Sequence, residues 1–425
     1  MSEGTTVGKR SDLMWRVPDF RRLWVGQTLS MFGTNMIAVA VPLIAAVSLG
    51  ASVFAMSLIT ATEFVPYLVI SLFVGVWLDR RPKRQIIVLT DLVRAGALLV
   101  VPVAWWSGAL SVPLLIAVVF VVGSCSVVAD IGNAAILPSL VENADLMEGN
   151  SKLEVSQSVS NLAGLTVGGV VVQALTGPIA VLVNVFTYAA AALSTALIRK
   201  RETRPEPAEE PESVWRSMAE GIRFIFGYQT IRTLVIVTFV INFFVFATDP
   251  VFLYFIAADL KLAPWLVGVI MAASGAGWLL GALVAPRLSK RIPFGPLVIA
   301  AVTGIALSSM IAPVATLLPV VPAVALLIMA QASHSVTVIV ANVNIRSYRS
   351  AVTPDDMQGR MNASARMLVM AGSPFGAFAG GALGSWLGTS AALVIGSAGL
   401  LVAAVVLGCS SVRQVKPIPD AALVA

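Results

Sequence analysis

The feature that most constrains this chain is a succession of apolar runs, each about 20 residues or longer, separated by short polar turns. A helix of that length crosses the hydrocarbon layer of a membrane, which is ~30 Å thick. Of the 425 residues, 58% are hydrophobic and 12% are charged, whereas an ordinary soluble domain is about one quarter charged. The sequence therefore predicts an all-α integral membrane protein and excludes a water-soluble domain.

The apolar runs and their polar punctuation place twelve membrane helices, six in each half of the chain. The domain boundaries that follow are an N-terminal segment 1–22, a first six-helix bundle 23–198, a linker 199–232, a second six-helix bundle 233–410 and a tail 411–425. The predicted helices span about 23–48, 53–78, 85–106, 112–138, 155–175, 178–198, 233–257, 264–285, 293–314, 318–345, 363–384 and 389–410. Within the linker, residues 214–228 carry apolar side chains at helical spacing on one face and charged side chains on the other, which predicts an amphipathic helix at the membrane surface.

The charged residues indicate how the chain is oriented. The net charge is +6, but the cations lie in short turns and form no basic face with interleaved aromatic residues, so nucleic acid is not an expected partner. Lys261 alone falls in a turn assigned to the outside. Both termini are therefore predicted to be cytoplasmic. Cys125 and Cys409 both lie in apolar runs, and a disulfide between them is not expected.

The two halves carry related motifs before and within their fifth helices. Asp145-Leu-Met-Glu-Gly149 corresponds to Asp355-Asp-Met-Gln-Gly359. The glycines of the fifth helix recur at one constant offset in the eleventh, which also contains Pro374; the two sets are Gly164, Gly168, Gly169 and Gly376, Gly380, Gly381. Small residues at this spacing let helices approach closely, so helix packing is their expected role. A repeat of two six-helix bundles places a substrate site near mid-membrane between the halves.

A basic turn follows the second predicted helix, with the sequence Gly75-Val-Trp-Leu-Asp79-Arg80-Arg81-Pro82-Lys83-Arg84. It resembles the loop signature of the major facilitator superfamily, with Trp77 and Pro82 in the usual Leu and Gly places. The resemblance implies a gating role in which Asp79 pairs at the helix end while Arg80, Lys83 and Arg84 bind the neighbouring half. The alternative is that these cations only set topology.

Two further stretches resemble one bacterial subgroup of that superfamily, which contains enterobactin exporters and macrolide efflux pumps. They are Val17-Pro-Asp-Phe-Arg-Arg-Leu-Trp-Val-Gly-Gln and Asp91-Leu-Val-Arg94-Ala. This resemblance implies export of a small organic molecule. The chain departs from many proton-coupled exporters, because its fourth helix lacks their arginine and its fifth helix lacks the proline of their signature, which reduces the support for proton antiport.

Besides Arg366 near the start of the eleventh helix, five charged residues fall inside the predicted helices, where each unpaired charge costs about 2.5–3.5 kcal/mol. Glu63 and Asp249 lie in the outer half, and we expect them to face the central cavity as proton-coupling or cation-binding carboxylates; the alternative is a packing or water-exposed role. A helix that ends early at Pro250 would instead leave Asp249 in water. Asp91 and Arg94 share one helix face and are expected to pair and brace the cytoplasmic gate. Asp130 can pair with Arg94 or with Arg366, closing the halves on the inside.

The remaining candidates are uncharged polar residues in the apolar runs. His334, the only histidine, can titrate near neutral pH, but a bond to a neighbouring helix is the more common role. Asn35 and Asn242, with Gln27, Asn161 and Asn184, can bond either a ligand or another helix.

The sequence predicts a transporter and not an enzyme. It contains no catalytic constellation, no phosphate-binding loop and no metal-ligand cluster, so no cofactor is expected. Our interpretation is a secondary transporter of the bacterial cytoplasmic membrane, acting as a monomer in the lipid bilayer and exporting a small molecule in exchange for protons. The alternatives are an importer or uniporter of a small metabolite, or, in a different class, an intramembrane enzyme or receptor.

Overall fold

The computed structural model describes residues 13–70, 73–74, 77–78, 81–142, 145–175, 177–200, 214–354 and 357–415. Within these ranges it consists of helices and connecting turns, without strands. Eleven helices are long and apolar enough to cross a membrane, and α3 (Val53–Val69) is a shorter apolar helix at the place of the second predicted span. The predicted all-α membrane architecture is confirmed.

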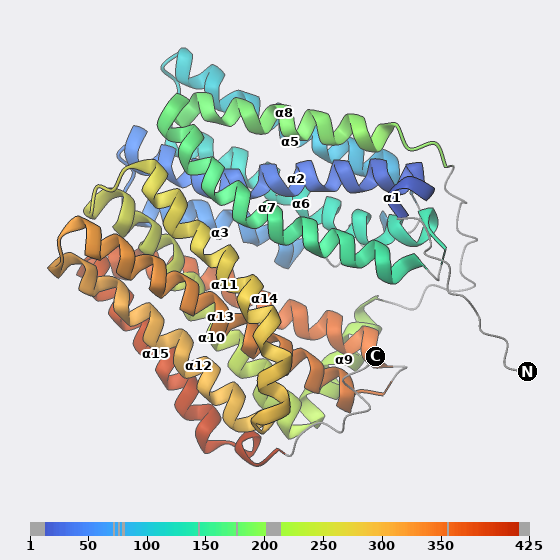
Figure 1. Cartoon of the computed structure of the whole chain (residues 1–425), viewed down its shortest axis with the longest axis vertical. Helices are drawn as coiled ribbons and strands as arrows, with labels where there is room; N and C mark the ends of the chain where they lie inside the picture. The colour runs from blue at the N-terminus through green and yellow to red at the C-terminus, as the bar shows by residue number, and fades with distance from the viewer. Residues whose placement is uncertain are drawn as a thin grey trace, which may run out of the picture.

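The helices follow the predicted order (Figure 1). The first half contains α1 (Leu13–Arg16), α2 (Pro18–Leu43) continued by η1 (Ile44–Ser48), α3, α5 (Lys83–Trp106), α6 (Val112–Leu140), α7 (Leu146–Leu175) and α8 (Gly177–Ala196). The second half contains α9 (Val214–Gly227), α10 (Gln229–Tyr254) continued by η3 (Phe255–Asp259), α11 (Pro264–Arg291), α12 (Phe294–Ile311), η4 (Ala312–Leu317), α13 (Val320–Val352), α14 (Gln358–Leu387), α15 (Thr389–Cys409) and η6 (Ser411–Gln414).

Several helices are longer than predicted at one end. α7 begins at Leu146, before the predicted start at 155, and α13 continues to Val352. The polar residues that marked the predicted boundary of α7 do not break a helix, and Lys152 Nζ lies 3.5 Å from Glu148 Oε1, one turn away. The apolar runs therefore located the membrane-crossing part of each helix, while the helices themselves extend beyond it.

Short turns connect consecutive membrane helices. Gly50, Gly108 and Gly388 have φ of 59°, 70° and 84°, a region that favours glycine. Ser52 accepts a hydrogen bond from the Ala55 amide, which caps the start of α3. These residues allow the chain to reverse direction within a few positions.

The first long helix of each half packs on two others of that half, and two pairs of helices make most of the contact between the halves. α2 packs on α7 and α8, and α10 packs on α14 and α15. Across the boundary, α3 packs on α14 and α7 packs on α11. In Figure 1 the two groups of helices converge on the left and diverge toward the end where α1 and α9 lie.

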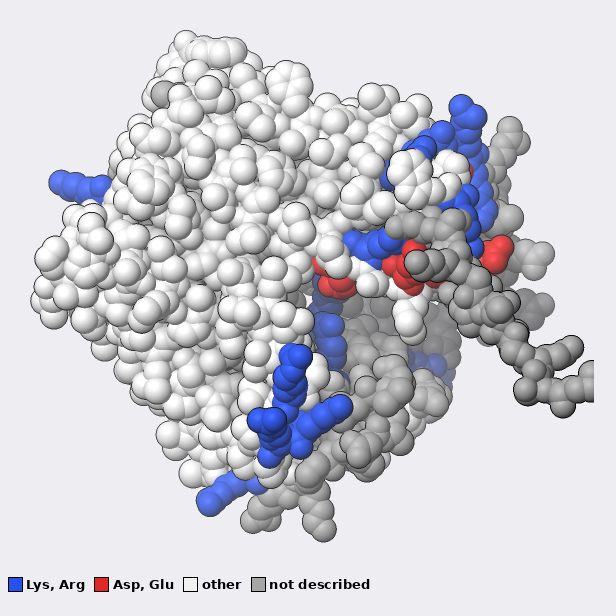
Figure 2. Space-filling view, in the orientation of Figure 1, with Lys and Arg blue, Asp and Glu red and all other residues white. Residues whose placement is uncertain are grey.

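We call the diverging end, which carries α1, α9 and the first turns of α5 and α7, the charged end, and the other the opposite end. In Figure 2 the charged side chains gather mainly at the charged end, and most of the remaining visible surface is neutral. At this end Arg16 donates to Asp145 over 2.8 Å, and this hydrogen bond raises the pKa of Arg16.

The buried clusters explain where the halves touch. One large cluster near the opposite end combines both halves and includes Leu43, Met56, Val251, Phe255 and Val267. The other three clusters each lie within one half; one of them joins α1, α2, α5 and α6, and the other two belong to the second half. The halves are therefore packed together at the opposite end and separated at the charged end.

The predicted amphipathic helix is present as α9, but it packs on protein. Ile225 is fully buried against a cluster that includes Met361 and Ala365 of α14. Glu220 accepts from Arg360 over 2.7 Å, and the Ser364 hydroxyl donates to the Met218 carbonyl over 3.2 Å. α14 therefore covers part of the apolar face of this helix, and its location at the membrane surface stays a prediction.

Candidate functional site

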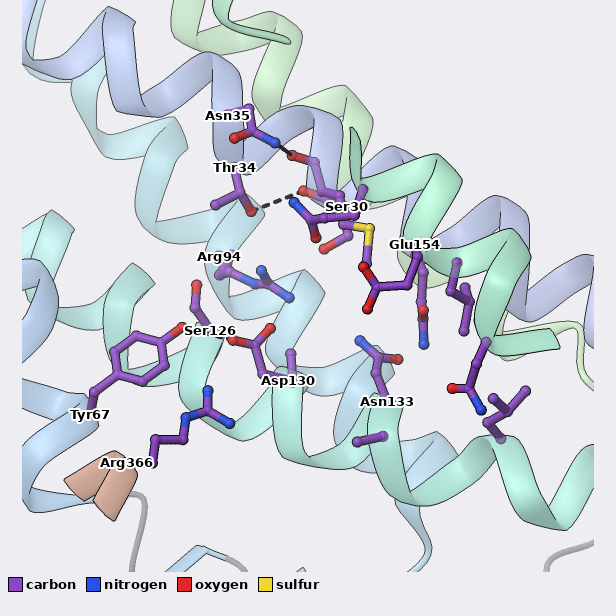
Figure 3. A pocket seen from close by; sticks show the side chains of 18 residues that line it. Ser30, Thr34, Asn35, Tyr67, Arg94, Ser126, Asp130, Asn133, Glu154 and Arg366 are labelled. Atoms are coloured by element: carbon purple, nitrogen blue, oxygen red, sulfur yellow. Dashed lines mark hydrogen bonds between the residues drawn. The ribbon is translucent and has the colours of Figure 1, made fainter. Parts of the chain in front are cut away.

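A polar cavity of about 440 Å³ lies toward the charged end, between helices of the first half and α14. Figure 3 shows its lining. Its polar side chains come from six helices and are Gln27, Ser30, Thr34, Asn35, Tyr67, Arg94, Ser126, Asp130, Asn133, Asn150, Glu154, Gln157 and Arg366. Five of the 18 lining residues are apolar, namely Met31, Ala129, Ala134, Leu137 and Leu153. Ligand pockets are mostly apolar with a few polar groups, so this lining suits a hydrophilic molecule.

Three buried polar atoms on the cavity wall have no hydrogen-bond partner in the described part of the chain. They are Gln27 Nε2, Arg94 Nε and Asn133 Oδ1. Leaving a buried donor or acceptor unpaired costs about 1–3 kcal/mol. Such groups are normally paired with protein, water or a bound molecule, and the three residues that carry them line the cavity.

Arg94 is held in place by an ion pair and by an aromatic ring. Its guanidinium donates to Asp91 Oδ1 over 2.5 Å, and the two residues are 3% and 2% exposed. Ser30 also donates to Asp91, over 3.2 Å, and the guanidinium carbon lies 4.6 Å from the centre of the Tyr188 ring. The predicted intrahelical pair is confirmed, and it orients Arg94 toward the cavity.

Asp130 is exposed to the cavity and accepts a hydrogen bond from the Tyr67 hydroxyl over 2.7 Å. In Figure 3 Tyr67, Asp130 and Arg366 point toward the same part of the cavity, with Arg366 supplied by the second half. The ion pairs of the described residues include none between Asp130 and either Arg94 or Arg366. The predicted closing pair is therefore not formed in this structure, because the halves are apart at this end.

Glu63 lies on α3 one turn from Tyr67, but it is not part of the cavity lining. Its backbone carbonyl packs against Gly123 of α6. Within the described ranges, its carboxylate has no hydrogen-bond or ion-pair partner. Of the amides proposed from sequence, Asn35 lines the cavity and donates to the Met31 carbonyl over 2.9 Å, as drawn in Figure 3. Asn242 donates to the Thr238 carbonyl of its own helix over 3.0 Å.

Asp249 and His334 lie together in a second, much smaller cavity of about 30 Å³ within the second half. His334 Nδ1 is 3.1 Å from the Ser309 hydroxyl of α12, so the predicted bond to a neighbouring helix is confirmed. α10 continues through Pro250 to Tyr254, so this proline does not end the helix. Proline removes one backbone hydrogen bond, and the surrounding helices tolerate this.

The basic turn is only partly described. Gly75, Asp79 and Arg80 lie outside the described residues. The Arg84 guanidinium donates to the Ile198 carbonyl at the end of α8, within its own half. Arg84 thus has a contact within the first half, and its predicted contact with the other half stays a prediction.

The repeated glycines occupy equivalent contacts in the two halves. A Cβ at Gly164 or Gly168 would meet α2, and one at Gly376 or Gly380 would meet α10, the first helix of each bundle. A Cβ at Gly169 would lie 2.6 Å from the Pro264 carbonyl oxygen of α11, and one at Gly381 would lie 2.4 Å from Ser57 Cβ of α3. The last glycine of each set therefore lies between the two halves.

Some residues of the cavity were not identified from sequence. Tyr67 is an ordinary residue in an apolar run, Glu154 lies just before the predicted start of its helix, and Gln157 lies just after it. Asn133 stands in an apolar run, where an amide is unusual, so its sequence context contained the signal. The cysteines are free, as expected.

Comparison with curated proteins identifies bacterial transporters as relatives. Over 275 residues the chain is 24% identical to the multidrug efflux pump Tap of Mycobacterium tuberculosis, a match that covers 62% of this chain and 64% of the pump. Over 386 residues it is 25% identical to the uncharacterized MFS-type transporter YfiS of Bacillus subtilis, covering 88% of each chain.

Solved structures with the same fold are transporters. They include the nucleoside transporter NupG (D323A mutant), with a TM-score of 0.73 and 12% identity over 92% of this chain and 99% of that one. A bacterial homologue of the iron transporter ferroportin in an inward-facing state has a TM-score of 0.69 and 15% identity, covering 93% and 98%. A sequence profile of the Major Facilitator Superfamily matches residues 23–348. The chain is a membrane transporter that belongs to the Major Facilitator Superfamily.

Proposed function

We propose that this protein exports a small hydrophilic organic molecule in exchange for protons, through alternating access to the polar cavity. The observation that carries the proposal is the cavity itself, which lies toward the charged end and is lined by Gln27, Arg94 and Asn133, each with a buried polar atom that has no partner among the described residues. The likeness to a protein named a multidrug efflux pump supports export as the direction.

The charged end is assigned to the cytoplasm, because cytoplasmic segments of membrane proteins carry an excess of Lys and Arg. Both chain ends then lie in the cytoplasm of a bacterial inner-membrane protein, and the structure corresponds to an inward-facing state. Export begins when the molecule enters the cavity from the cytoplasm. Residues 23–198 and 233–410 then move as two units that close the charged end and open the opposite end.

The charges of the cavity favour a molecule with a cationic group. Asp130 and Glu154 line it, and within the described residues neither carboxylate has an ion-pair partner. The charge of Arg94 is balanced by Asp91, whereas Arg366 faces the same space from the second half. A polar molecule with an ammonium group would be attracted by the two carboxylates.

Glu63 is the carboxylate that we propose for proton coupling. It lies within an apolar helix and has no bonding partner in the described part of the chain, so its ionised form is costly there. Movement of one proton through 100 mV supplies about 2.3 kcal/mol, enough for a gradient of roughly fiftyfold. Glu63 thus lies one helical turn from the cavity residue Tyr67.

Cellular accumulation tests the proposal. Cells with and without the protein would be loaded with fluorescent cations, macrolides and catecholate siderophores, in the presence and absence of a protonophore. We expect lower accumulation of a cationic compound, abolished by the protonophore and by Glu63→Gln. Export that persists at full rate in Glu63→Gln removes this residue from coupling, and accumulation that rises with the protein indicates import.

A further inference from the structure

The small cavity of the second half brings together two ionisable side chains from different helices. Asp249 is supplied by α10 and His334 by α13, and Thr248, Gln331, Ser308 and Ser309 complete its polar lining. The residues that line the large cavity do not include any of these six. The two cavities are therefore separate sites.

Asp249 has no hydrogen-bond or ion-pair partner among the described residues, and its side chain is exposed to the small cavity. An isolated carboxylate inside a membrane helix is costly when ionised, by about 2.5–3.5 kcal/mol on insertion scales. A group that can share a proton with the carboxyl reduces that cost. The imidazole of His334 is such a group and lines the same cavity.

The volume of the cavity suits water and excludes an organic substrate. A buried water needs about 10–15 Å³ of accessible space and two to four polar partners, so the cavity of about 30 Å³ can hold about two. Asp249, Gln331 and His334 offer the partners. His334 Nδ1 is engaged by the Ser309 hydroxyl over 3.1 Å, which leaves Nε2 as the nitrogen for such a water.

We propose that Asp249 and His334 form a water-bridged proton-exchange site in the second half, separate from the polar cavity. The step transfers one proton between the carboxyl and Nε2, so that a carboxylic acid with a neutral imidazole interconverts with a carboxylate and an imidazolium. The proton breaks one O–H bond and forms one N–H bond, through water, and no other reactant is needed. This inference deepens the proposed proton coupling and rests on it only for its use in transport.

Other charged groups near α10 do not replace His334 in this role. α12 and α15 carry no Asp, Glu, Lys, Arg or His, and those of α14 lie in its first turns, at Arg360 and Arg366. α3 packs on α10 through Phe64 and Phe246, and Glu63 of α3 is not among the residues that line the small cavity. Asp259 of η3 accepts from the Thr389 hydroxyl and is thereby engaged at the opposite end. Among the residues that line the small cavity, His334 is the one ionisable side chain besides Asp249.

Infrared difference spectroscopy of the full-length protein in lipid nanodiscs tests the site during a pH titration. The carboxylic-acid band of Asp249 should be present in the wild type and absent in Asp249→Asn. It should also be present in Glu63→Gln, a control that removes the carboxyl of α3. In His334→Gln the proton affinity read from this band should change by about tenfold, as for two coupled sites. If His334→Gln does not fold, Gln331→Leu, which removes a ligand of the bridging water, should also change the affinity.

Two results would overturn the proposal. One is a band whose proton affinity is the same, within about threefold, in the wild type and in the folded variant, because coupled groups differ by more. The other is loss of the carboxylic-acid band when sodium chloride is added at constant pH, because this would show that a metal cation replaces the proton in the cavity. A band that behaves as expected in a protein without proton-driven transport would instead refute the proposed function and leave the site intact.

Discussion

Arg94 and Asp91 are almost completely enclosed by the first half, and neither charge would be tolerated there alone. Their side chains meet at 2.5 Å, with Ser30 and Tyr188 as further partners. Removing one member of a buried pair typically costs 3–5 kcal/mol, because the other charge remains uncompensated. Each of the two charges is therefore tolerated in the folded protein only while the other is present.

Asp91→Asn should lower the thermal stability of the purified protein strongly, by roughly 3–5 kcal/mol, and Asp91→Asn with Arg94→Gln should recover part of the loss. Arg216→Gln is the matched control, since Arg216 is 81% exposed in its pair with Glu220 and such pairs contribute about 0–1 kcal/mol. Thermal unfolding in detergent measures all three. A double variant as unstable as the single one would show that the two charges are not coupled.

Asp130 and Arg366 face the same space from opposite halves, and closure of the charged end would bring them together. We predict that Arg366→Glu, which places like charges there, slows transport, and that the exchange Asp130→Lys with Arg366→Glu restores part of the rate. The accumulation assay measures each variant. An exchange variant no better than Arg366→Glu alone would exclude a pairing role.

Among the helices, α7 and α14 have equivalent roles, because each packs on the first helix of its own half and on a helix of the other half. Gly164 and Gly376 make the first kind of contact, and Gly169 and Gly381 make the second. At Gly169 the backbone of α11 is so close that a Cβ would lie 2.7 Å from Gly268 Cα. The opposite end can therefore close only if no side chain is present at this position.

Gly169→Leu should separate the halves at the opposite end and shift the protein toward the state open there, since overpacking costs about 1–3 kcal/mol. Gly164→Leu is the control, because its added side chain would meet Asn35 Cβ, 2.7 Å from the new Cβ, within one half. Spin-label distances between α3 and α14 near the opposite end should lengthen in the first variant only. Equal distances in both would contradict a gating role for Gly169.

The helices themselves were predictable, because an apolar run long enough to cross a membrane has few alternatives to a helix. Their ends were not predictable, as α7 shows. This helix begins at Leu146, several residues before the apolar run that predicted it. For the cavity, Arg94, Asp130 and Arg366 were identified because charges stand out in apolar runs. Tyr67 was not, since its role depends on the tertiary contact with Asp130.

Across the whole molecule, the packed opposite end and the separated charged end define one state of an alternating-access cycle. The polar cavity belongs mainly to the first half, and the small cavity with Asp249 and His334 belongs to the second. Coupling between substrate and protons then requires that both halves change together. The account therefore predicts that movement of a substrate is accompanied by movement of protons in the opposite direction.

Everted membrane vesicles containing the protein, with an acidified interior and a pH-sensitive dye, test this claim most directly. Addition of a cationic compound from the panel should release protons from the vesicles and restore dye fluorescence, and Glu63→Gln should abolish the response. The same vesicles without the protein provide the baseline. Uptake of the compound without proton release, or acidification in place of release, would contradict proton-coupled export.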